Sequence, residues 1–234
     1  MGAIELEASE YLKPTNLAQS DHPEIAELAV KLTSGLEVAD AVKSLYMFVR
    51  DAVKWTIEGV KPAIEVLRSR KGICFNKASL QVALLRAAGI PARYRLEEVD
   101  SRVLKPYLPP RVYELFPSSV IHVLAEVHLG GVWLGCDATL DFALSMPSWK
   151  RSWDVGVDLS CIPPIYKIKV VGQYPDLPVD VVLNPIRDVV EKDWVQREVD
   201  EYLDKIRAMS PEEKLKHFTE GWGSSVVENL RSRR

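Results

Sequence analysis

Cysteine, excess charge of one sign and long apolar runs are all scarce in this sequence. The 234 residues include only three cysteines, Cys74, Cys136 and Cys161, with no C-x-x-C pair among them. An odd count without such a pair favours a reducing compartment over a disulfide framework. The formal net charge of -3 excludes the basic surplus that is typical of nucleic-acid-binding proteins. No apolar run reaches the roughly 18 residues that a membrane span requires.

The first residues lack the features of a targeting segment. They carry acids where a signal peptide needs positive charge and an apolar run, and Leu6 stands where a myristoylation signal needs Ser or Thr. We therefore expect a soluble, cytoplasmic protein that binds neither nucleic acid nor membranes. A composition of 47% hydrophobic and 27% charged residues is an ordinary balance for a globular protein.

The pattern along the chain predicts helices, then an antiparallel sheet, then helices again. Helical spacing of apolar residues dominates the first 72 residues and continues in a largely apolar helix over 74–88, which ends at Gly89 and Pro91. Strand-like patterns follow at 92–99, 120–140 and 165–172, and helical patterns return from about 185. This order predicts an α+β fold. We assign residues 1–184 to one domain and residues 185–234 to a C-terminal helical extension packed on it.

A hairpin between residues 120 and 140 can be placed in register. Gly130-Gly131 is a favoured two-residue turn, and a turn there pairs Ala125 with Cys136. One face of the hairpin is then apolar, which makes Cys136 a core residue, whereas a three-residue turn would mix the two faces. On the other face His122 and Asp137 become diagonal neighbours, about 7–8 Å apart at the backbone and within side-chain reach.

The same register argues against a metal centre. His128 lies on the His122 face but six residues along the strand, roughly 20 Å away, so the two histidines cannot hold one ion. No cysteine pair has the spacing of a zinc site. We therefore expect neither a metal nor another cofactor.

Cys74, at the start of the apolar helix, is either a small buried residue or a nucleophile. A helix N-terminus and a nearby imidazolium group lower the pKa of a cysteine thiol, and the free backbone N–H groups there can stabilise an oxyanion. His122 would then act as base and acid, with Asp137 orienting its ring. Each residue taken alone is more typical of a structural role. Their agreement in face and order favours a site, but the residue pattern alone leaves both interpretations open.

Three motifs resemble the transglutaminase-like superfamily, which has a papain-like cysteine-hydrolase core. They are "RKGICFNKASLQVALLRAAGIPAR" around Cys74, "HVLAEVHLGGVW" around His122 and "DAT" at Asp137. The likeness covers residues 15–140 and indicates a small member of bacterial or archaeal type. It implies that Cys74 is the nucleophile, His122 the base and Asp137 the orienting acid. It also implies a central cysteine helix packed on an antiparallel sheet.

The resemblance implies an acyl transferase or hydrolase that works through a thioester intermediate. The substrate would be an acyl compound, a peptide or a carrier-bound thioester, and the oligomeric state is open. Water as acceptor gives hydrolysis, an amine gives amide formation, and an internal carbon nucleophile gives a Dieckmann-type cyclisation known in natural-product pathways. A catalytically silent binding scaffold is the alternative from another class of proteins, which the intact Cys-His-Asp set argues against.

Three further residues are candidates for the wall of an acyl pocket. Leu124 stands where many members of the superfamily have an aromatic residue. Tyr107 and Tyr113 lie in the proline-rich segment 99–120, which is longer than a simple connection. We expect this segment to form one wall of the pocket, although a surface cover for the sheet is equally compatible with the pattern. Trp55 is interpreted as a core aromatic at the end of a helix. Asn76 and Lys77, in the first turn of the apolar helix, either line the cleft or form a polar N-terminal turn.

Overall fold

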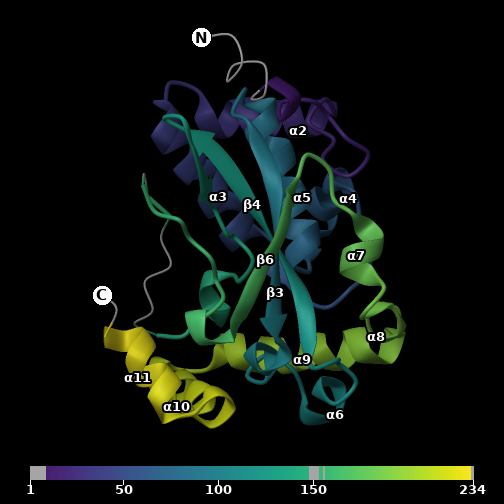
Figure 1. Cartoon of the computed structure of the whole chain (residues 1–234), viewed down its shortest axis with the longest axis vertical. Helices are drawn as coiled ribbons and strands as arrows, with labels where there is room; N and C mark the ends of the chain where they lie inside the picture. The colour runs from purple at the N-terminus through teal and green to yellow at the C-terminus, as the bar shows by residue number, and fades with distance from the viewer. Residues whose placement is uncertain (1–8, 148–152, 155, 233–234) are drawn as a thin grey trace.

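A computed structural model describes residues 9–147, 153–154 and 156–232 of the chain. A twisted four-stranded sheet stands beside a bundle of helices, and further helices lie across one end of the sheet (Figure 1). This arrangement confirms the predicted α+β fold.

The N-terminal helices surround one central helix. These are α2 (Pro23–Thr33), α3 (Val38–Ala52) and α4 (Ala63–Ser69), and each packs against α5 (Cys74–Ala87). Two short strands, β1 (Lys54–Trp55) and β2 (Lys71–Gly72), pair in parallel and join this layer together.

Helix α5 is buried along almost its entire length, from Cys74 to Arg86. A buried polar side chain is tolerated only when it is hydrogen-bonded, and those of α5 meet this requirement. The ammonium group of Lys77 donates to the backbone carbonyls of Arg50 and Val53, at the end of α3. Lys77 therefore fixes α3 against α5.

The sheet has the strand order β5-β4-β3-β6 and is antiparallel throughout. Its strands are β3 (Ala92–Asp100), β4 (Ser119–Leu129), β5 (Val132–Gly135) and β6 (Lys167–Tyr174). The hairpin register is confirmed, because Leu129 pairs with Val132 and the backbone N–H of Cys136 donates to the carbonyl of Ala125. Gly130 and Gly131 have φ of 59° and 84°, the positive values that a type I′ turn requires.

The two faces of the sheet differ in chemistry. Val123, Ala125 and Val127 are fully buried, and Tyr94, which pairs with Ala125, reaches Ser79 of α5 through its hydroxyl. The opposite face holds buried charged groups that neutralise one another. Its ion pairs join Arg93 to Glu126, Arg95 to Glu126, Glu97 and Asp158, and Lys167 to Glu97.

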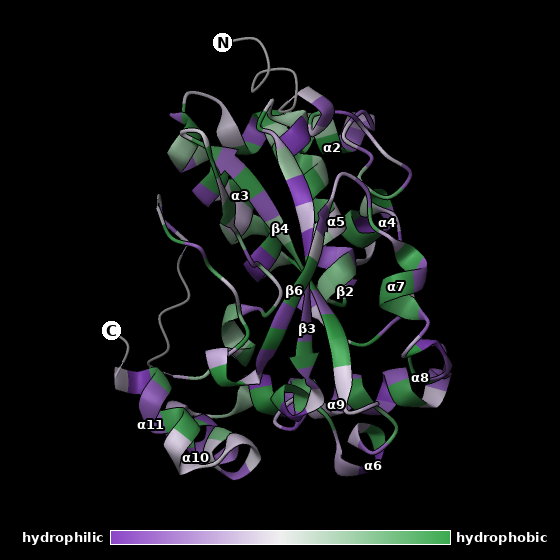
Figure 2. Cartoon of the chain, viewed as in Figure 1, coloured by the Kyte–Doolittle hydropathy of each residue, from purple (hydrophilic) through white to green (hydrophobic). Residues whose placement is uncertain are grey.

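The C-terminal part of the chain is helical, as predicted. It contains α7 (Val179–Leu183), α8 (Arg187–Val190), α9 (Asp193–Ala208), α10 (Pro211–Trp222) and α11 (Ser224–Ser232). In Figure 2 α9, α10 and α11 carry both hydrophilic and hydrophobic stretches, as helices with one face on a core do. Ser210 and Glu213 form a capping box at the start of α10.

The C-terminal helices are bonded to the central region. Arg207 of α9 donates to Asp141 and to the backbone carbonyl of Trp55 at 2.9 and 2.7 Å. The division of the chain at residue 184 stays a prediction. Among the described helices, none has the length and apolar character needed to cross a membrane.

The long connection between β3 and β4 contains two short helices. They are a 3-10 helix, Ser101–Leu104, and α6 (Pro110–Tyr113). Two other 3-10 helices, Phe142–Leu144 and Pro164–Tyr166, lie in the irregular stretch before β6.

Candidate active site

Cys74 is the first residue of α5. Ile73 precedes it in an extended conformation and provides no side-chain cap, so no side chain at that position satisfies the N–H groups of the first turn. The turn into the helix is tight. A Cβ atom on Gly72 would lie 2.9 Å from the Cβ of Asn76, which explains why glycine stands two residues before Cys74.

Asn76 holds the segment in front of the helix. Its Nδ2 donates to Glu58 Oε1 and to the carbonyl of Gly59 at 3.0 and 2.9 Å, and its Oδ1 accepts from the N–H of Lys61 at 2.9 Å. Both the nitrogen and the oxygen of this fully buried amide are therefore hydrogen-bonded within the fold. Asn76 therefore holds the segment 58–61 against the start of α5.

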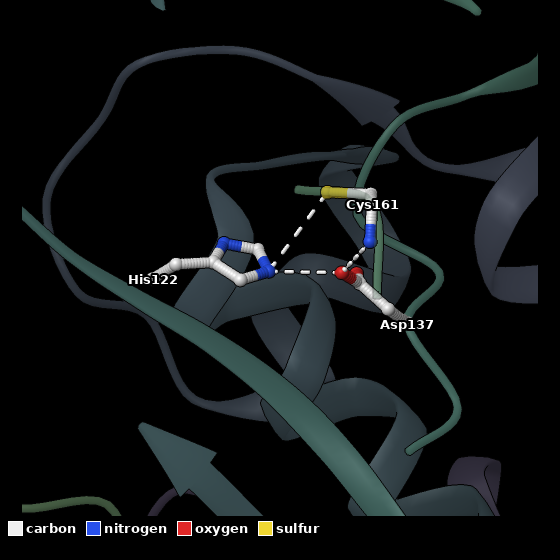
Figure 3. Close-up of side chains that lie close together, drawn as sticks. All are labelled: His122, Asp137 and Cys161. Carbon is white, nitrogen blue, oxygen red and sulfur yellow. Dashed lines mark hydrogen bonds and ion pairs between the residues drawn. The ribbon is translucent and has the colours of Figure 1, made fainter. Parts of the chain in front are cut away.

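His122 and Asp137 form a buried pair (Figure 3). Nε2 of His122 lies 2.9 Å from Oδ2 of Asp137. The carboxylate is held from two further sides, because Oδ1 accepts from the N–H of Thr139 and Oδ2 accepts from the N–H of Cys161, at 3.0 and 2.6 Å. The structure thus brings together the histidine and the aspartate that the hairpin register placed on one face.

Each member of this pair changes the protonation of the other. Burial by itself would lower the pKa of His122, but the Asp137 carboxylate and the nearby Cys161 sulfur outweigh it and raise that pKa well above its ordinary value. Burial would likewise raise the pKa of Asp137. The charge of His122 and the three hydrogen bonds that the carboxylate accepts outweigh burial and bring the pKa of Asp137 well below its usual range. The imidazole therefore holds its proton, and the carboxylate stays charged, at neutral pH.

Cys74 and His122 line the same cavity. Within the described part of the chain, Nδ1 of His122 makes no hydrogen bond, and Figure 3 places it on the side of the ring away from Asp137. The ring therefore has one nitrogen engaged with its acid and the other available to a reacting group.

Cys161 is a neighbour of the pair that the sequence analysis missed. Its Sγ lies 3.8 Å from Nε2 of His122 (Figure 3). Its side chain lines the same cavity as Cys74. The residue sits in the irregular stretch before β6, where no periodic pattern relates it to the hairpin. Only the folded chain shows that it belongs to the site.

The three polar atoms of His122, Asp137 and Cys161 lie within 4.8 Å of one another, close enough to surround a metal ion. Their present bonding is that of a hydrogen-bonded network. Oδ2 of Asp137 already accepts two hydrogen bonds, and an ion on Nε2 would replace the proton that joins His122 to it. The arrangement therefore suits proton transfer and charge stabilisation.

The cavity has a volume of about 60 Å³ and is walled by several elements. Tyr107 lies in its lining, whereas Tyr113 and Leu124 lie outside it, so a part for any of the three in substrate choice stays a prediction. Leu124 is buried on β4, two residues beyond His122. Trp55 also lines the cavity, from β1, although the sequence suggested only a core aromatic at the end of a helix.

Cys136 is separate from the site. It is fully buried, and its sulfur accepts from the side-chain amide of Gln81 at 3.1 Å. Burial raises the pKa of the Cys136 thiol well above its ordinary value. This thiol therefore remains protonated in the core, as the hairpin register predicted for its location.

Comparisons with known proteins agree with this geometry. Residues 26–138 match the family model of the transglutaminase-like superfamily. A solved structure of a candidate cysteine protease from Cytophaga hutchinsonii has a similar fold, with a TM-score of 0.51 and 23% sequence identity over 73% of this chain. The chain spans about half of that protein, 47% of its length. No curated protein matches the sequence. The chain is therefore similar to the transglutaminase-like superfamily over residues 26–138, just under half of its length, and it shares its fold with the solved structure.

Proposed function

We propose that the protein is a cysteine-dependent acyl transferase or hydrolase, with Cys74 as nucleophile, His122 as acid and base, and Asp137 as the orienting group. One observation carries this proposal. Nε2 of His122 is committed to Asp137, while its Nδ1 has no partner among the described residues and the ring lines the same cavity as Cys74. A catalytic triad needs this division of labour between the two ring nitrogens.

The same observation argues for Cys74 over Cys161 as the nucleophile. The Cys161 sulfur lies beside Nε2, the nitrogen that already faces the Asp137 carboxylate. A thiol at that position competes with the orienting acid for one nitrogen. Cys74 also has the N-terminus of a 14-residue helix behind it, and the N–H groups of the first turn can receive the negative charge of a tetrahedral intermediate.

The reaction proceeds in two stages. The Cys74 thiolate attacks the acyl carbonyl carbon, the C=O electron pair moves onto oxygen, and the intermediate collapses by breaking the bond to the leaving group, which takes a proton from the His122 imidazolium. The product is a thioester on Cys74. An acceptor then attacks the thioester carbon, His122 removes the acceptor's proton, and the Cys74 sulfur leaves as thiolate. Water, an amine or an internal carbon nucleophile would each complete this second stage.

Intact-mass analysis after incubation with p-nitrophenyl butyrate tests the proposal. We expect one acyl group per chain, mapped to Cys74, and no adduct on Cys74→Ser. The matched control is Cys161→Ser, which makes the same substitution in the same cavity and should still form the adduct. An adduct that disappears only in Cys161→Ser would assign the nucleophile to Cys161. The absence of both an adduct on the wild-type protein and release of p-nitrophenolate above the uncatalysed rate, with every activated ester, would favour a catalytically silent scaffold.

A further inference from the structure

The cavity beside Cys74 is lined mainly by apolar side chains. Apart from Cys74, His122, Thr139 and Cys161, every residue in the lining is aliphatic or aromatic, and none of the lining residues carries a carboxylate, an ammonium or a guanidinium group. An ionised group that enters such a space loses its hydration, and apart from the His122 imidazolium, which is already paired with Asp137, it finds no partner for its charge. The lining therefore disfavours charged acyl groups and accepts apolar ones.

The size of the cavity limits the length of the acyl group. A volume of about 60 Å³ has room for roughly five water-sized groups, at roughly 10–15 Å³ for each. An acyl chain of about four to six non-hydrogen atoms fills this space. A longer chain would have to displace the wall or project out of the cavity, which is open on one side.

One wall of the cavity is braced by the C-terminal helix α10. Tyr107, in the lining, makes edge-to-face contacts with Trp55, Phe218 and Trp222, with ring centroids 5.7, 5.5 and 5.9 Å apart. The indole N–H of Trp222 also donates to the carbonyl of Val103, a second lining residue, at 3.0 Å.

Two further contacts fix the segment between Val103 and Tyr107. Nε2 of His217 lies 2.6 Å from the carbonyl oxygen of Pro106. A Cβ atom on Gly221 would lie 2.7 Å from Cγ of Pro106, so α10 approaches this segment closely. Because close-packed interiors resist expansion, the wall sets an upper limit on the acyl group and does not adapt to it.

We propose that the acyl donor carries a short, uncharged, apolar acyl group that fills this cavity, with its carbonyl carbon at Cys74 and its leaving group outside. This assignment rests on the proposed cysteine-dependent acyl chemistry. It adds that α10, which lies outside the segment matched by the family model, sets the length limit through Tyr107 and Val103.

The full-length protein and a series of p-nitrophenyl esters test the assignment. The series comprises the acetate, butyrate, pentanoate and octanoate, together with the hemisuccinate, which is similar in length to the pentanoate and carries a carboxylate. The rate of Cys74 acylation is measured by intact mass and by release of p-nitrophenolate, and each rate is divided by that of uncatalysed hydrolysis. We expect butyrate and pentanoate to react about tenfold or more faster than octanoate and hemisuccinate, a ratio that corresponds to about 1.4 kcal/mol.

The outcomes separate this assignment from the function on which it rests. Acylation of Cys74 at comparable rates by all the esters, or fastest by octanoate or hemisuccinate, would overturn the acyl-group assignment and leave the acyl chemistry standing. Failure of every ester to acylate Cys74 would overturn both.

Variants at Leu104 provide a second test. This residue lines the cavity and is only partly buried, so a substitution there is less disruptive than one deep in the core. Leu104→Ala should raise the relative rate for octanoate, and Leu104→Lys should raise the relative rate for hemisuccinate, each about tenfold, or about 1.4 kcal/mol. Leu115, which is 41% exposed and outside the lining, provides Leu115→Ala and Leu115→Lys as matched controls with wild-type preferences.

Folding of every variant is checked by circular dichroism. If the Leu104 variants fold and keep the wild-type order of esters, the assignment is wrong. If they fail to fold, the wild-type ester series alone decides the matter, by the same criteria.

Discussion

The Sγ atom of Cys161 lies 3.8 Å from Nε2 of His122, the same ring nitrogen that contacts the Asp137 carboxylate. Two thiols therefore line one cavity with the histidine, and their relation to its ring differs. Cys161 stands on the side of the orienting acid, whereas Cys74 stands at the start of a helix. We therefore expect the thiols of Cys74 and Cys161 to differ in reactivity.

Alkylation is expected to distinguish all three thiols. Iodoacetamide at pH 6–7, followed by peptide mapping, should label Cys74 first, because it combines a helix N-terminus with a histidine in the same cavity. Cys136 should stay unlabelled in the folded protein, since burial raises the pKa of its thiol and it is fully enclosed. Faster labelling of Cys161 or Cys136 than of Cys74 would contradict the nucleophile assignment.

Replacement of the orienting acid should reduce turnover far more than it reduces stability. Asp137→Asn removes the charge that orients His122 and stabilises its protonated form, and we expect kcat to fall by about 10²–10⁴-fold. The amide also weakens the hydrogen bond from the Cys161 N–H to this position, which should lower the free energy of unfolding by about 1–3 kcal/mol. Steady-state kinetics and urea denaturation measure the two effects. Wild-type kcat in a folded Asp137→Asn protein would remove Asp137 from the mechanism.

The His122–Asp137 pair should make stability depend on pH in a defined window. The pKa of His122 is raised above its ordinary 6.5, so its contribution is fully present below pH 6.5 and is lost as the pH rises through the higher folded value. The pKa of Asp137 is lowered from 3.8, so its contribution is present above pH 3.8 and is lost as the pH falls towards the lower folded value. Together they stabilise the protein most between pH 4 and 6.5.

Comparison of Tm between the wild-type protein and His122→Gln over pH 5–10 checks this window. The glutamine amide can donate to Asp137 but does not titrate. We expect the Tm advantage of the wild type to be greatest near pH 5.5 and to decrease towards pH 10. An advantage that is constant, or that grows with pH, would show that His122 is not charged in the folded state.

The approach of Gly72 to α5 gives a prediction with an internal control. Gly72→Ala places a Cβ atom 2.9 Å from the Cβ of Asn76, which should displace the start of the helix and cost about 1–3 kcal/mol of stability. Acylation of Cys74 should slow as well, because the nucleophile is two residues away. Gly59→Ala, in the loop that Asn76 holds, meets no atom within 4 Å and should leave both properties close to wild type. Equal effects of the two substitutions would show that the close approach at Gly72 is unimportant.

The two tyrosines of the segment between β3 and β4 should differ in their effects. Tyr107 lines the cavity and stacks on Trp55, so Tyr107→Leu should change kcat/KM unequally among the p-nitrophenyl esters. Tyr113 lies outside the lining, and Tyr113→Leu should change all esters alike or not at all. Iodoacetamide labelling of Cys74 should remain intact in both variants. A uniform loss in Tyr107→Leu would mean that the residue only supports the fold.

The sequence alone was sufficient for the features that rest on local patterns. The apolar run after Cys74, closed by Gly89 and Pro91, predicts the buried central helix, and the alternating pattern around Gly130-Gly131 predicts the hairpin in its observed register. Two local features specify the register of a hairpin, namely the turn type and the face that must be buried. This register predicted that His122 and Asp137 lie on the same face of the hairpin.

Only the tertiary structure decided what surrounds that pair. Cys161 contacts His122 from an irregular stretch of the chain. Trp222 is hydrogen-bonded to Val103, which lies more than a hundred residues earlier. The side chain of Asn76 is hydrogen-bonded to Glu58 in a preceding loop. No periodicity relates such segments to one another, because their positions follow from how whole elements pack and not from the spacing of neighbouring residues. The sequence therefore determined that His122 and Asp137 lie together, whereas the packing of distant segments determined the shape of the cavity and the second thiol beside it.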